Sequence, residues 1–261
     1  MASSTFPAFV APSTASVTVE PDGRYTVRIT AADIGTGART ALTQIAADAL
    51  GVGMDRVEVR IGDSDFGSAM SAGGSMGTAS WSWAVIKACR ELGPAAAPGQ
   101  SVKVNTREEV GSQRELSRYA FGAQFVEVRV DADTGEVRVP RMTGVFSCGR
   151  IVNPRTARSQ FMGGMVWGLS MALHEHSVVD HRFGHVVNHD LAEYHVPVCA
   201  DIGEIDVSWL DEEDLRANAL GAKGIGEIGI TGTAAAVASA VHNATGIRVR
   251  DLPITPDRLL R

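Results

Sequence analysis

Cysteine is scarce in this chain of 261 residues, which has three cysteines and no CxxC pair. The odd number and the spacing argue against an iron–sulfur cluster, a zinc ribbon or a disulfide framework held by this chain, and they favour a reducing compartment. Positive charge is also in short supply, because 24 Lys and Arg stand against 30 Asp and Glu, for a net charge of −6. The chain therefore lacks the basic surface expected of a protein that binds nucleic acid or acidic lipid.

Long apolar runs are missing as well, since none approaches the roughly 20 residues needed to cross a bilayer. The first residues have neither a cationic start nor a long apolar stretch, so no secretory signal is visible. We therefore expect a cytoplasmic protein, with periplasmic export in company with a partner subunit as the alternative. Glycine, by contrast, is abundant, with 28 residues. Glycine is needed where the backbone bends tightly or approaches another group closely.

The hydrophobic pattern predicts a mixed α/β (α+β) fold, in which strands and helices follow each other in both halves of the chain. In the first half a strand, a helix and a strand within about forty residues suggest a βαβ unit, normally a right-handed crossover. The expected strands are 16–20, 25–31, 56–61, 125–130, 136–140, 204–210 and 247–252. The expected helices are 38–50, 78–92, 156–174 and 233–244.

Composition divides the chain into two expected lobes of mixed sheet with packed helices. Residues 1–15 are rich in Ser, Thr, Pro and Ala and are expected to form an extended lead-in. Residues 16–93 would form the first lobe, with its glycine loops. A Pro/Gly/polar linker would span 94–118, and the second lobe would span 119–261.

Three glycine-rich turns are each expected to lead into a helix, at Gly35–Gly37, Gly73–Gly77 and Gly224–Gly229. A helix N-terminus exposes unpaired N–H groups that can hold a phosphate or another anion. Nearby side chains could add further donors; they are Thr36, Ser75, Thr78 and Gln160. Any one turn could be only a tight connection. The three together favour an extended, phosphate-bearing cofactor.

The third turn also matches the dinucleotide fingerprint, with glycines at 224, 226 and 229 and Asp251 in the place of a ribose-binding acid. No convincing strand precedes Gly224, however, and Glu227 would put a carboxylate where a pyrophosphate should sit. An NAD-binding protein is therefore a distant alternative.

Glu227 is a candidate general base, because it lies among glycines and isoleucines with Lys223 as the nearest basic residue in sequence. Apolar surroundings raise the pKa of a carboxyl group towards neutrality, where proton abstraction is efficient. The alternatives are a surface glutamate or an ion pair with Lys223.

Histidines are concentrated between His174 and His195, and two of their spacings would suit metal ligands on a helix. Residues 180–184 are instead typical of a hairpin turn, and no acidic or thiol partner has the spacing of a zinc site. We expect no metal held directly by protein side chains. Cys89 and Cys148 are expected to be small buried residues.

Four stretches together resemble one known family: residues 33–37 (DIGTG) with 43–51 (TQIAADALG), 73–80 (GGSMGTAS), 148–154 (CGRIVNP) with Gln160, and 221–229 (GAKGIGEIG) with 249–256 (VRDLPITP). They are similar, in order and spacing, to the C-terminal molybdopterin-binding part of the large subunit of the xanthine dehydrogenase/aldehyde oxidase family. The bacterial aldehyde-oxidising branch is the most similar. The resemblance covers nearly the whole chain and implies the fold of the second molybdopterin-binding domain of a molybdenum hydroxylase.

The resemblance implies that Glu227 is the catalytic glutamate, the base that activates water-derived oxygen for attack on an electron-poor carbon. The residues expected to bind the cofactor are Gly35, Thr36, Gly37, Gly74, Ser75, Gly77, Gln160 and Gly226. The cofactor would be molybdenum-molybdopterin, with the molybdopterin cytosine dinucleotide as a possible form. Many members have glutamine where Thr36 stands, and Trp167 replaces a common glutamine.

The resemblance also implies partners and a substrate. Family large subunits are several hundred residues longer at the N-terminus, so the chain would be a fragment, a truncated product or one piece of a split subunit. It would need the missing N-terminal molybdenum-binding half, a 2Fe–2S subunit and an FAD subunit to oxidise an aldehyde or an N-heterocycle. The main alternative is a remnant of the family without cofactor that serves as an interaction module and exposes an apolar patch.

Overall fold

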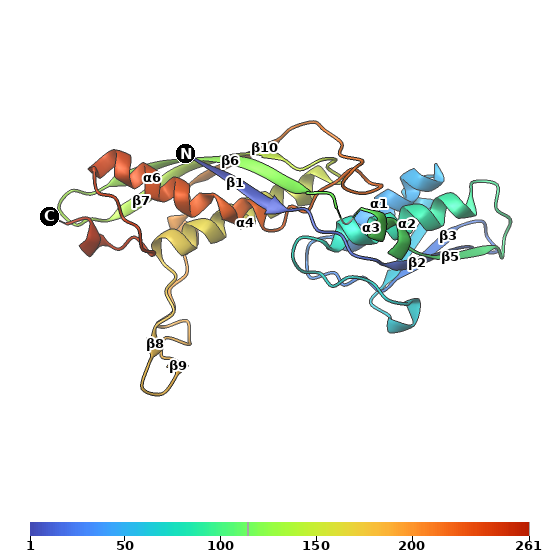
Figure 1. Ribbon diagram of the computed structural model, residues 1–261, viewed down its shortest axis with the longest axis horizontal. Coiled ribbons are helices and arrows are strands. Elements are labelled where there is room, and N and C mark those ends of the chain that lie inside the picture. The colour runs from blue at the N-terminus through green and yellow to red at the C-terminus, as the bar shows by residue number, and fades with distance from the viewer. Residues whose placement is uncertain (114, 261) are drawn as a thin grey trace.

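The computed structural model describes residues 1–113 and 115–260 and shows two lobes, each with its own sheet and hydrophobic core (Figure 1). This is the mixed α/β fold predicted from the sequence. No helix in the described part of the chain is both long and apolar enough to cross a membrane.

The first lobe is built on a four-stranded sheet in the order β4-β3-β2-β5. Its strands are β2 (Thr14–Val19), β3 (Tyr25–Ile29), β4 (Val57–Ile61) and β5 (Ser101–Asn105). Its helices are α1 (Ala38–Leu50), α2 (Gly77–Leu92) and α3 (Arg107–Ser112). Because β3 and β4 are parallel and α1 connects them, the predicted βαβ unit is confirmed. Valines of the sheet and the apolar face of α1 make the core.

The second lobe has the sheet order β1-β6-β7-β10. Its strands are β1 (Ala2–Pro7), β6 (Tyr119–Val130), β7 (Val137–Ser147) and β10 (Glu204–Trp209). Its helices are α4 (Pro154–Leu173), α5 (Ile228–Thr231) and α6 (Thr233–Thr245). α4 and α6 run along one face of the sheet (Figure 1). In the core between them, Phe146 of β7 stacks on Phe161 of α4 with ring centroids 4.4 Å apart.

A two-stranded hairpin, β8 (Val179–Asp180) and β9 (His185–Val186), projects away from both sheets (Figure 1). It contains the turn predicted at 180–184, which is confirmed. Short 3-10 turns complete the chain; they are η1 (Met54–Arg56), η2 (Ser64–Phe66), η3 (Cys199–Asp201) and η4 (Pro256–Arg258).

Three expectations about extended segments need correction. The expected lead-in, residues 1–15, contains β1, which pairs with β6 as an edge strand and so needs little apolar alternation. The expected linker, 94–118, contains β5 and α3, and β5 pairs with β2. The strand expected at 247–252 does not form: Ile247 and Val249 pack against the second core, but the structure shows no strand paired with them.

Candidate cofactor site

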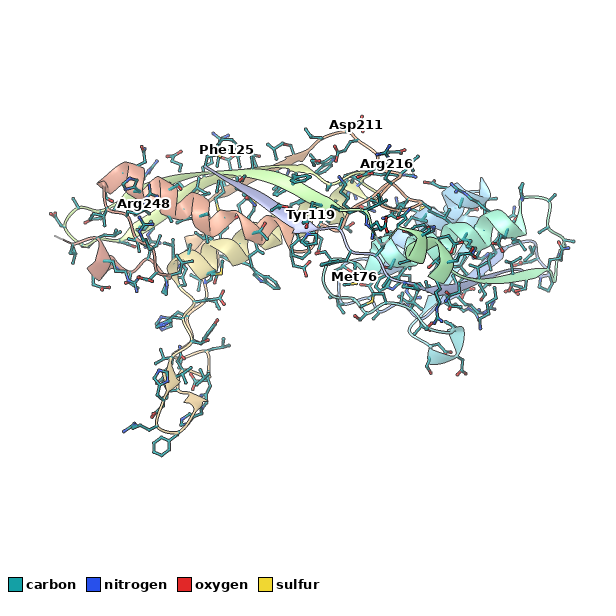
Figure 2. All side chains as sticks on the ribbon, viewed as in Figure 1. Met76, Tyr119, Phe125, Asp211, Arg216 and Arg248 are labelled. Carbon is teal, nitrogen blue, oxygen red and sulfur yellow. The ribbon has the colours of Figure 1, made fainter. Side chains whose placement is uncertain are left out.

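A cavity of about 290 Å³ lies where the two lobes meet. The loops before α1 and α2 line it from the first lobe, and residues 150–160 and 222–227 line it from the second. Among the predicted site residues, those that line it are Thr36, Ser75, Gly77, Gln160, Gly226 and Glu227. Gly35, Gly37 and Gly74 belong to the same loops but do not line the cavity themselves. Figure 2 labels Met76, which marks the loop before α2 at this junction.

The second and third glycine loops meet directly across the two lobes. Ser75 has a left-handed backbone with φ of 56°, and its Oγ accepts a hydrogen bond of 2.9 Å from the Glu227 N–H. A Cβ at Gly224 would collide with the carbonyl oxygen of Ser75, and one at Gly226 would lie 3.1 Å from Ser75 Oγ. The glycines therefore permit a close approach of two backbones. Sequence reasoning selected Ser75 as a ligand for phosphate and missed its bond to Glu227.

Glu227 is half-buried at the start of α5, where it is the N-cap residue. Burial raises the pKa of its carboxyl group, and the backbone N–H of Ser75, which acts on the carboxyl group, offsets this only in part. Its buried Oε2 has no hydrogen-bond partner among the described residues. Lys223 Nζ lies 3.2 Å from Asp214 Oδ2 instead, so the ion pair between Glu227 and Lys223 that was left open is wrong. The carboxyl group therefore lies in a partly buried environment that raises its pKa.

The first glycine loop is occupied by a carboxylate of its own chain. Asp33 Oδ1 accepts hydrogen bonds from the N–H groups of Gly35 (3.0 Å) and Gly37 (3.2 Å), and Oδ2 accepts one from Arg39 N–H (3.3 Å). Partial burial opposes ionisation, but these backbone bonds outweigh it and lower the pKa of Asp33. The amides of this loop are therefore already bound. Within Gly35–Gly37, Thr36 is the residue that lines the cavity. An aspartate two residues before a glycine is a turn signal that could have predicted this.

The start of α4 ties the lobes together beside the cavity. Asn153 caps the helix by accepting from two backbone N–H groups, and its Nδ2 donates to Gln44 Oε1 of α1 at 3.0 Å. Arg150 Nη2 lies 2.7 Å from Asp48 Oδ2, also on α1. Arg150 and Asn153 both line the cavity. Sequence reasoning had not assigned them individual roles, although Asn before Pro is a recognisable helix start.

Trp167 lies on a different face of α4 from the buried core residues Met165 and Leu169. Trp167 itself is 62% exposed and lines the cavity, on the same helix as Gln160. The indole ring is therefore available to a molecule bound between the lobes.

The remaining candidates do not form a second site. No strand stands directly before Gly224 in the described chain, and α5 has only four residues, so the dinucleotide fingerprint lacks its structural context. Among the residues described, no three His, Cys, Asp or Glu side chains converge as metal ligands. Cys89 and Cys148 are buried as predicted, and burial raises the pKa of each thiol to about 12.

Comparison with known proteins gives consistent matches. The family model for the molybdopterin cofactor-binding domain matches residues 1–110 and 98–203. The aldehyde oxidoreductase molybdenum-binding subunit PaoC of Escherichia coli is 44% identical over 279 residues, covering 95% of this chain and 38% of that subunit. The probable hypoxanthine oxidase XdhD of Escherichia coli is 29% identical over 283 residues, covering 94% of this chain and 30% of that protein.

Solved structures share the fold. Aldehyde oxidoreductase from Desulfovibrio gigas has a TM-score of 0.84 at 24% identity, over 99% of this chain and 31% of that one. Carbon monoxide dehydrogenase from Oligotropha carboxidovorans has a TM-score of 0.85 at 18% identity, and the match covers 98% of this chain and 39% of that one. The chain thus spans less than half the length of the curated relatives it matches. With a family model covering most of its length, the chain belongs to the molybdopterin cofactor-binding domain family of molybdenum hydroxylases.

Proposed function

We propose that this chain is the C-terminal molybdenum-cofactor-binding part of an enzyme that oxidises an aldehyde or an N-heterocycle with water-derived oxygen, with Glu227 as general base. The observation that carries the proposal is the buried, unpartnered Oε2 of Glu227 beside the cavity between the lobes. Two relatives, an aldehyde oxidoreductase and a probable hypoxanthine oxidase, support both substrate classes.

The lining of the cavity fits a molybdopterin cofactor. It offers hydroxyl groups from Ser75 and Thr78, the amide of Gln160, and cationic side chains at Arg150 and Lys223. These groups suit a phosphate-bearing pterin, and we propose the cytosine dinucleotide as its possible form. When bound, the cofactor supplies the oxygen-transfer and two-electron chemistry.

The chain itself supplies a proton acceptor, Glu227, and the side chains that hold this residue in position. Glu227 is suited to take up a proton because burial raises the pKa of its carboxyl group. Ser75 fixes the backbone of Glu227, and Trp167 offers an exposed aromatic surface at the cavity. The remaining electron path would need 2Fe–2S and FAD subunits and the N-terminal molybdenum-binding half, which we propose as partners in the cytoplasm.

An interaction module without cofactor is the second candidate. Tyr119, Phe121 and Phe125 of β6 are 42%, 53% and 47% exposed, and such a patch fits a docking surface. Figure 2 labels two of them, Tyr119 and Phe125. The same patch would also suit a subunit of a larger enzyme, so the metal content of the purified chain separates the two functions.

Replacing Ser75 with aspartate should lower cofactor occupancy several-fold. An aspartate can still accept the bond from Glu227 N–H, but it adds a negative charge beside an anionic cofactor. Ser75→Asn is the matched control, because it keeps the acceptor and tolerates the left-handed backbone without the charge. Molybdenum and pterin per chain would be measured in both variants. Equal occupancy in wild type and Ser75→Asp would remove Ser75 from the cofactor site.

A further inference from the structure

A glutamine is fully buried in the middle of β6. Gln124 is 0% exposed, on the face of the sheet that α4 and α6 cover. Its Nε2 donates to the carbonyl oxygen of Gly229 at 2.9 Å and to that of Ile228 at 3.3 Å. These carbonyls belong to α5, directly after Glu227. A buried amide is unfavourable unless it is hydrogen-bonded, so these two bonds explain which end of the amide faces α5.

The other end of the same amide is not satisfied. Gln124 Oε1 is buried and has no hydrogen-bond partner among the described residues. It lies so close to Gly232 that a Cβ there would collide with it. An apolar side chain of similar size would avoid an unpaired buried oxygen. Stability alone therefore does not account for a glutamine at this position, whereas a requirement to hold α5 does.

Helix α5 has only four residues, too few to be stable by itself, so its position depends on its neighbours. Thr231 and Thr233 bond to the carbonyls of Ile228 and Gly229, but both belong to the same segment of chain. Ser75 holds the Glu227 N–H from the first lobe. Among the side-chain hydrogen bonds of the described residues, those of Gln124 tie α5 to the sheet of the second lobe.

We propose that Gln124 is a positioning residue for Glu227, because its amide anchors the first residues of α5 to β6 and thereby holds the Glu227 carboxyl group in the cavity. The purpose of this anchor rests on the proposed function of Glu227, but the anchor itself does not. The charged groups that share the cavity with Glu227 are Arg150 and Lys223, and both are paired with aspartates. A change at Gln124 therefore reaches Glu227 through α5 rather than through a neighbouring charge.

The test is Gln124→Met, which keeps the length of the side chain and removes its donor. The Glu227 carboxyl group would be titrated by carbon-13 NMR in the full chain, with Glu227→Gln to assign its signal. We expect the pKa of Glu227 in Gln124→Met to fall by roughly half a unit or more towards that of an exposed glutamate. The control is Ser4→Ala, which removes a buried, unpartnered hydroxyl from the same sheet and should leave the titration unchanged. A wild-type titration curve in folded Gln124→Met would overturn the proposal.

A second measurement covers the case in which Gln124→Met does not fold. In the wild-type chain, the side-chain amide protons of Gln124 should exchange with solvent about a hundredfold more slowly than those of an exposed glutamine. Exchange at the exposed rate would refute the anchor. If the anchor holds but Glu227→Gln keeps full turnover, the role of Glu227 as base fails and the positioning of α5 stands.

Discussion

Glu227→Gln is expected to reduce turnover of the assembled enzyme by about 10²–10⁴-fold or more, with molybdenum and pterin content unchanged. Glutamine has nearly the shape of glutamate and can keep the backbone bond to Ser75, but it cannot accept a proton at neutral pH. The loss should therefore appear in kcat rather than in cofactor binding. Turnover and metal content would be measured on the same preparations.

The pH profile gives an independent check of the same residue. A general base must be ionised, so the wild-type rate should rise with pH through the pKa of Glu227. Burial raises that pKa, which places the rise above the ordinary range of glutamate. Any residual rate of Glu227→Gln should lack this rise. Glu204→Gln, at an exposed position on β10, is the control and should behave as wild type. Wild-type turnover in Glu227→Gln would remove Glu227 from the chemistry.

Two adjacent glycines of α4 should respond in opposite directions to alanine. Gly164 packs against α5: a Cβ there would lie 2.9 Å from Gly229 Cα and 3.1 Å from Ile230 N, which are backbone atoms that cannot rotate away. We expect Gly164→Ala to lower the free energy of unfolding by about 1–3 kcal/mol. Gly163 is exposed, and a Cβ there would meet nothing within 4 Å. Gly163→Ala should therefore raise the free energy of unfolding by about 0.5–1 kcal/mol, because alanine has the higher helix propensity.

Urea unfolding of the two variants and the wild-type chain measures this difference, and each variant serves as the other's control. Gly164→Ala should also shift the position of Glu227, because Glu227 directly precedes α5. Equal stability of the two variants would mean that α4 and α5 are not in close contact. Gly164 and Gly168 both lie where α4 packs tightly against the segment around α5, whereas the structure places nothing close to Gly163.

Periodicity predicted the regular elements well. The helix expected at 38–50 has those bounds, and the helix expected at 156–174 is α4. These segments have a clear apolar face and recognisable ends, so local sequence determines them. Strands β1 and β5 were missed because they lie in polar stretches and are edge strands. Their partners are far away in the sequence, and pairing at an edge leaves little hydrophobic pattern to detect.

The site was predictable as a set of loops but not as a set of bonds. The glycine turns and the resemblance brought Ser75, Gln160 and Glu227 together, and all three line the cavity. The bond from Glu227 N–H to Ser75, the capping of the first loop by Asp33 and the anchor at Gln124 were not predicted. Each depends on which side chain forms a hydrogen bond with a particular backbone N–H or carbonyl group. Such contacts leave no periodic pattern in the sequence.

Molybdenum content is the most direct measurement of the central claim, made by elemental mass spectrometry on the chain purified from its native host with whatever co-purifies. Near-stoichiometric molybdenum is the predicted result, because the cavity between the lobes offers the donors that a molybdopterin cofactor needs. A folded chain without molybdenum, both alone and when co-expressed with an upstream molybdenum-binding half, would contradict the cofactor assignment and leave the interaction module as the better account.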